Sequence, residues 1–73
     1  MPIFEAMPKP IELPGAVARA FVRDMRTFHA AGGTGHKADA IAAQQRHALK
    51  QHYKGKLRLT DVKEMFLRRR DQA

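Results

Sequence analysis

The sequence predicts an all-α fold, a small three-helix bundle preceded by an extended arm. Two long runs of apolar residues recur at helical spacing, and a shorter third run follows them. All four prolines lie within the first 14 of the 73 residues. Because proline removes a backbone donor and biases its predecessor towards extended geometry, residues 1–13 are expected to form the arm and residues 14–73 a single helical domain.

The arm is apolar as well as rich in proline. Six of its thirteen residues are large and apolar: Met1, Ile3, Phe4, Met7, Ile11 and Leu13. Flexible linkers do not usually carry such a load of apolar side chains. We therefore expect the arm to be ordered and to pack on something. The sequence leaves open whether that is the domain's own core or a groove or sheet edge of a partner.

The first helix is predicted over residues 14–31. Pro14 suits the first helical position, where the missing N–H has no cost. Apolar residues then recur on one face at spacings of four, four and three: Val17, Phe21, Met25 and Phe28. Gly32 and Gly33 are expected to end the helix, because glycine adopts the left-handed cap conformation at little cost.

The second helix is predicted over residues 36–54. Its start is capped by Thr34 or Gly35, and the sequence does not decide between them; Gly55 is expected to close it. Gln45 and His52 lie on its apolar stripe, where they fit either a hydrogen-bonded core or a polar spot in an interface. Residues 56–59 are expected to form an extended link.

The third helix is predicted over residues 60–70. Thr60 is a good N-cap residue, and Asp61 follows in the first turn, where an acid favours the helix dipole. The predicted core combines the apolar faces of all three helices with the two leucines of the link: Val17, Phe21, Met25, Phe28, Ile41, Leu49, Leu57, Leu59, Val62 and Phe66.

Length and composition limit the classes of protein. A chain of 73 residues buries roughly 60% of its unfolded surface, so there is room for one small core; dimerisation would bury more apolar surface and stays open. The absence of cysteine excludes disulfides and thiolate zinc sites. No apolar run approaches the ~18 residues of a membrane span. The first residues lack a signal-peptide pattern, so a cytoplasmic location is expected.

Catalytic and cofactor chemistry is not expected. The chain has neither serine nor cysteine, and its seven acids are scattered without helical spacing that would pair them. The four histidines are not placed to share a metal ion. The glycine-rich residues 32–37 differ from a phosphate-binding loop in the preceding helix, the glycine spacing and the residue after the lysine.

Charge placement is the clearest functional signal. Lys and Arg total 14 against 7 acids, which gives a net charge of +7, and residues 40–60 contain no acid. Each of the first two helices is predicted to carry a basic ridge opposite its apolar face: Arg19, Arg23 and Arg26 on the first, and Arg46, Lys50 and Lys54 on the second. Surfaces that only confer solubility usually mix both signs of charge.

These ridges predict binding of nucleic-acid phosphates with low sequence specificity. The candidate contacts are Arg19, Arg23, Arg26, Arg46, Lys50, Lys54, Lys56, Arg58, Arg68, Arg69 and Arg70. The alternative is a regulatory or adaptor protein that binds an acidic protein partner through the same basic faces. Its apolar or polar anchors would be Phe4, Met7, Ile11, Gln45 and His52.

Residues 51–66 resemble a DNA-binding helix-turn-helix in only a few positions. Leu57 and Val62 fit its apolar positions, but the link between Tyr53 and Thr60 is longer than the usual three to four residues. Asp61 and Glu64 would also lie on the reading face, where they repel phosphate. The sequence therefore favours contact with phosphates over the reading of bases.

Overall fold

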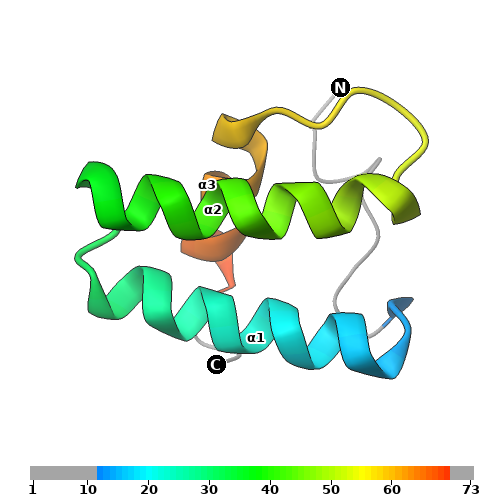
Figure 1. Cartoon of the computed structure of the whole chain (residues 1–73), viewed down its shortest axis with the longest axis horizontal. Helices are drawn as coiled ribbons and strands as arrows, with labels where there is room; N and C mark the ends of the chain where they lie inside the picture. The colour runs from blue at the N-terminus through cyan, green and yellow to red at the C-terminus, as the bar shows by residue number, and fades with distance from the viewer. Residues whose placement is uncertain (1–11, 70–73) are drawn as a thin grey trace.

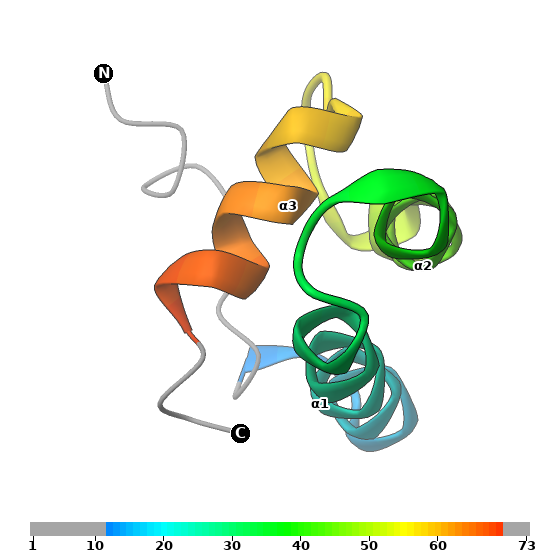
Figure 2. The ribbon, with the colours of Figure 1, turned by 90° about the vertical axis from the view of Figure 1, so that its left-hand side faces the viewer.

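The computed structural model describes residues 12–69, which form three α-helices and one short 3-10 turn. The elements are α1 (Gly15–Ala30), α2 (Gly35–Leu49), η3 (Lys50–His52) and α3 (Leu59–Arg68). α1 and α2 lie side by side and antiparallel, and α3 crosses one face of the pair (Figures 1 and 2). The predicted three-helix bundle is confirmed. Of the predicted arm, residues 1–11 lie outside the described range, and Leu13 is buried.

The end of α1 follows from its two glycines, as predicted. Gly32 and Gly33 have φ angles of 93° and 74°, in the left-handed region that favours glycine. The N–H of Gly33 donates to the carbonyl of Phe28, and the N–H of Gly32 donates to that of His29, both at 3.0 Å. This is the hydrogen-bond pattern of a Schellman cap, which satisfies the last carbonyls and turns the chain towards α2. Thr34 is the N-cap residue of α2.

α2 ends earlier than predicted, and this part of the prediction is wrong. The α-helix stops at Leu49, a 3-10 turn follows, and Tyr53 is extended with φ −129° and ψ 128°. The cause is tertiary packing: the Tyr53 ring packs against the core and Leu57 is 3% exposed. A helix continued to residue 54 would carry the chain away from both contacts.

α3 also begins differently from the prediction, because Arg58 and not Thr60 is its N-cap residue. The Asp61 carboxylate accepts a hydrogen bond from the backbone N–H of Arg58 at 2.9 Å, and the Asp61 N–H donates to the Arg58 carbonyl at 3.0 Å. Asp61 therefore reaches back to the start of the helix, as the acid of a capping box does. Its side chain is 4% exposed and also pairs with the Arg58 guanidinium at 3.4 Å.

Asp61→Ala is expected to lower the free energy of unfolding by about 1–2 kcal/mol, because it removes the acceptor that caps α3. Glu64→Ala is the matched control, since Glu64 lies on the same helix and is exposed. Thermal melts followed by far-ultraviolet circular dichroism compare the two variants. Equal melting temperatures for both would show that the Asp61 cap does not stabilise the fold.

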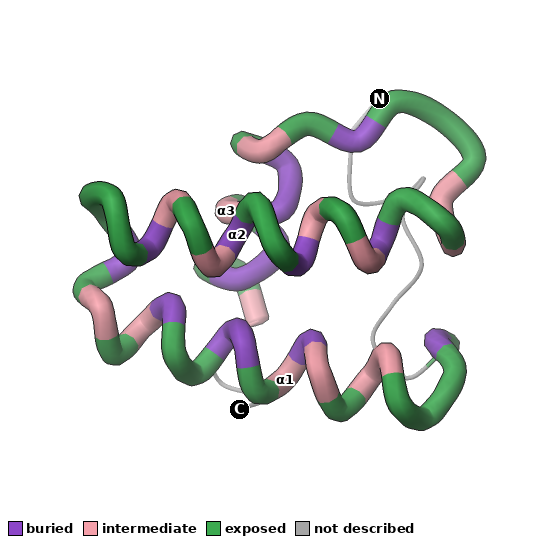
Figure 3. Tube along the Cα trace, viewed as in Figure 1, coloured by how far each residue is buried: buried purple, intermediate pink, exposed green. Residues whose placement is uncertain are grey.

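The core lies between the three helices, with the buried positions of α1 and α2 facing each other and α3 (Figure 3). Seven of the ten predicted core residues are buried, whereas Val17, Ile41 and Leu59 are only partly buried and pack against the edge of the core. The prediction missed the buried side chains of Leu13, Ala38, Ala42 and Met65. Ala38 and Ala42 are fully buried on α2, where a small side chain leaves room for a neighbouring helix. The sequence pattern did not indicate this, because alanine is common at both buried and exposed helix positions.

Two polar contacts join elements that are distant in sequence. Nε2 of His29 on α1 lies 2.9 Å from the carbonyl oxygen of Phe66 on α3. Lys63 on α3 donates to the carboxylate of Asp39 on α2 at 2.7 Å, with both side chains partly exposed. Each contact fixes α3 to one member of the antiparallel pair.

Candidate nucleic-acid interface

Two of the five acids in residues 12–69 are buried. Asp24 is 6% exposed and Asp61 is 3% exposed. Asp39 is partly exposed and bonded to Lys63. Within residues 12–69, only Glu12 and Glu64 are exposed acids.

The cations of the described chain are turned outward. The exposed Lys and Arg residues are Arg19, Arg23, Arg26, Lys37, Lys50, Lys54, Lys56, Arg58 and Arg68. Nine of the twelve cations in residues 12–69 are exposed, against two of the five acids, so the accessible surface of this range is more one-sided in charge than its composition alone indicates. Such a surface attracts polyanions over a distance set by the ionic strength.

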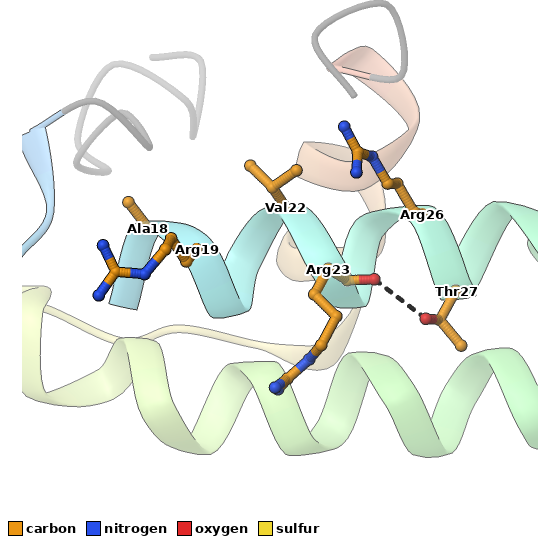
Figure 4. A pocket seen from close by; sticks show the side chains of 6 residues that line it. All are labelled: Ala18, Arg19, Val22, Arg23, Arg26 and Thr27. Atoms are coloured by element: carbon orange, nitrogen blue, oxygen red, sulfur yellow. Dashed lines mark hydrogen bonds between the residues drawn. The ribbon is translucent and has the colours of Figure 1, made fainter. Parts of the chain in front are cut away.

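The predicted ridge on α1 is exposed, as expected. Arg19, Arg23 and Arg26 line a shallow depression on α1 together with Ala18, Val22 and Thr27 (Figure 4). Nε of Arg23 lies 3.2 Å from Oδ1 of Asp24, and the Arg23 side chain remains 67% exposed. An ion pair so open to solvent leaves most of the guanidinium able to meet another anion.

The second basic element is residues 50–58, called here the basic loop. It leaves the end of α2 and turns back to the start of α3 (Figure 1). Leu57 fixes the loop in the core, and Nε of Arg46 on α2 donates to the Leu57 carbonyl at 2.6 Å. Three lysines between Arg46 and Leu57 in the sequence are exposed: Lys50, Lys54 and Lys56. The loop therefore presents three lysines from an anchored backbone.

The prediction that Lys54 lies on a helical ridge of α2 is wrong, because α2 ends at Leu49. Lys50, the C-cap residue, keeps right-handed helical geometry and its N–H donates to the Arg46 carbonyl, so it follows Arg46 by one helical turn. Lys54 lies in the bend after η3 and does not continue that face. Arg46 is only partly exposed, contrary to the expectation that it faces solvent, because it holds the loop carbonyl. Lys54 and Lys56 therefore belong to the basic loop and not to a helix face.

Arg19 belongs to the same end of the bundle as the basic loop. Figure 1 shows the start of α1 beside the end of α2, as their antiparallel packing requires. Arg19 lies in the second turn of α1 and Lys50 directly follows α2. Lys37, in the first turn of α2, lies at the opposite end.

The remaining predicted site residues are dispersed. Arg58 is exposed and paired with Asp61, and Arg68 is exposed at the end of α3. Arg69 is partly buried, and this desolvation lowers the pKa of its guanidinium from the usual range. Gln45 is 1% exposed, so a partner does not reach its amide in this conformation, and His52 is partly buried. Phe4, Met7, Ile11 and Arg70 lie outside the described residues.

Sequence reasoning did not single out Tyr53 as a candidate site residue, because its spacing fits the apolar stripe of a longer helix. In the structure it lies in the basic loop between His52 and Lys54, and the residue is partly exposed. The sequence feature that could have drawn attention to Tyr53 is its position as an aromatic residue within residues 40–60, which contain no acid.

No known protein family, curated protein or solved structure that was compared with the chain matches it. Among the helices of residues 12–69, none has the length and apolar character needed to cross a membrane. The same residues contain no group of three or more His, Cys, Asp or Glu side chains placed to hold a metal ion.

Proposed function

We propose that this protein binds nucleic acid through phosphate contacts, with low sequence specificity. The observation that carries the proposal is the division of charge in residues 12–69: three of the five acids are buried or bonded to lysine, whereas nine cations are exposed. Neutralising phosphates with such cations releases condensed counterions, which drives binding without reading bases.

The basic loop and Arg19 are the proposed centre of the contact surface. They lie at one end of the bundle, and the loop is held by Leu57 and Arg46 before any ligand arrives. An anchored loop loses little conformational freedom on binding, so more of the electrostatic attraction appears as affinity. Glu64, the exposed acid of α3, makes that helix the less favourable phosphate surface.

The test is fluorescence anisotropy with labelled duplex and single-stranded DNA of unrelated sequences. Within each form, duplex or single-stranded, the parent is expected to bind unrelated sequences with similar affinity, and log K should fall linearly with log salt. Changing Lys50, Lys54 and Lys56 together to Gln should lower the affinity by about tenfold per lost contact at ~0.1 M salt. Arg46 is left unchanged, since its substitution would also release the loop.

Lys54→Glu and Lys37→Glu form the matched control pair. Both residues are exposed and both changes alter the net charge equally, but Lys37 lies at the opposite end of the bundle. Lys54→Glu should weaken binding more than Lys37→Glu does. Equal effects would remove the basic loop from the proposal. Absence of DNA binding by the parent at low salt, together with binding of an acidic polypeptide, would replace nucleic acid with an acidic protein partner.

A further inference from the structure

We infer that the basic loop is a platform for single-stranded nucleic acid, on which Tyr53 stacks against a base while the neighbouring lysines contact phosphates. The inference rests on the proposed function and names the form of nucleic acid that the same surface takes. It follows from the position of one aromatic ring among exposed cations.

The ring of Tyr53 is held in place but not covered. One part packs against the core, and the residue as a whole remains partly exposed. The phenol end lies beside Gly55: a Cβ added there would stand 3.5 Å from Cε2 and 3.8 Å from both Cζ and the hydroxyl oxygen of Tyr53. Gly55 has no positive φ, so its backbone does not require glycine. A side chain at residue 55 would therefore touch the phenol end of the ring, where glycine places none.

The surroundings of the ring match what a single strand needs. Lys54 and Lys56 flank Gly55 in the sequence and are exposed, and the exposed Lys50 lies three residues before Tyr53. Stacking on aromatic rings combined with cations along the backbone is the general mode of binding single strands without sequence preference. In a duplex the bases are already stacked on each other, so Tyr53 gains nothing there and only the lysines contribute.

Tyr53 also provides its own probe. It is the chain's only tyrosine, and the chain has no tryptophan, so intrinsic fluorescence reports this ring alone. The experiment titrates the parent with an oligothymidylate of about 15 nucleotides, a duplex of equal length and inorganic polyphosphate. The single strand is expected to quench the tyrosine emission strongly, whereas polyphosphate should bind without comparable quenching because it has no bases.

Variants at Tyr53 measure the contribution of stacking to affinity. Tyr53→Leu keeps an apolar side chain against the core and should lower the affinity for the single strand about tenfold, leaving duplex affinity unchanged. Tyr53→Phe retains the ring and should bind as the parent does. Circular dichroism tests whether both variants fold. If Tyr53→Leu does not fold, the quenching of tyrosine emission in the parent still tests the inference.

The outcomes separate the two proposals. Binding of single strand, duplex and polyphosphate with no selective quenching, or an unchanged affinity of Tyr53→Leu, would overturn the stacking platform and leave phosphate binding intact. Failure of the parent to bind any of the three at low salt would overturn the proposed function itself.

Discussion

Replacing Phe66 with alanine is expected to lower the free energy of unfolding by about 3–5 kcal/mol, most of what a chain of this length has. Phe66 is fully buried, and its ring lies 5.2 Å from that of Phe21 and 5.0 Å from that of Phe28. The ring therefore joins α3 to α1, and its removal leaves a cavity in a core that is too small to close around it.

Leu67→Ala is the control for Phe66→Ala. Leu67 is the next residue on α3 and is 51% exposed, so its truncation should change the melting temperature little. Thermal and urea unfolding followed by circular dichroism at the helical band give both values. A Phe66→Ala variant that melts within about 5 °C of the parent would show that α3 is not packed on α1 as described.

Gln45→Met is expected to raise the free energy of unfolding by about 1–3 kcal/mol. Gln45 is 1% exposed, and neither Nε2 nor Oε1 of its amide has a hydrogen-bond partner among the described residues. A buried amide that has lost its water and gained no partner costs free energy, and methionine fills a similar volume without that cost.

Gln44→Met separates this effect from a general preference for methionine in helices. Gln44 precedes Gln45 on α2 and is exposed, so its substitution should leave the melting temperature nearly unchanged. A lower melting temperature for Gln45→Met would contradict the prediction and would show that the amide is satisfied in solution, for example by a buried water molecule.

Helical spacing and glycine placement were sufficient to predict α1 and most of the core. The spacing of Phe21, Met25 and Phe28 fixed the buried face of α1, and Gly32 with Gly33 marked its end. These features depend on neighbours in sequence, and local patterns reveal them directly.

The sequence did not predict features that depend on distant contacts. α2 ends at Leu49 because Tyr53 and Leu57 turn inward and Arg46 holds the loop, and no local breaker marks that point. The burial of Asp24 and Asp61 is equally hidden, since acids are normally surface residues. For the same reason the sequence showed the excess of cations but not the shape of the surface that carries them.

The burial of Asp24 and Asp61 affects how the fold responds to dissolved salt. The exposed cations repel one another across a small surface that offers few exposed carboxylates within residues 12–69 to offset them. Dissolved ions shorten the range of this self-repulsion and so favour the compact state. The same ions compete with the protein for phosphates. Added salt should therefore act in opposite directions, stabilising the folded chain while it weakens the proposed complex with nucleic acid.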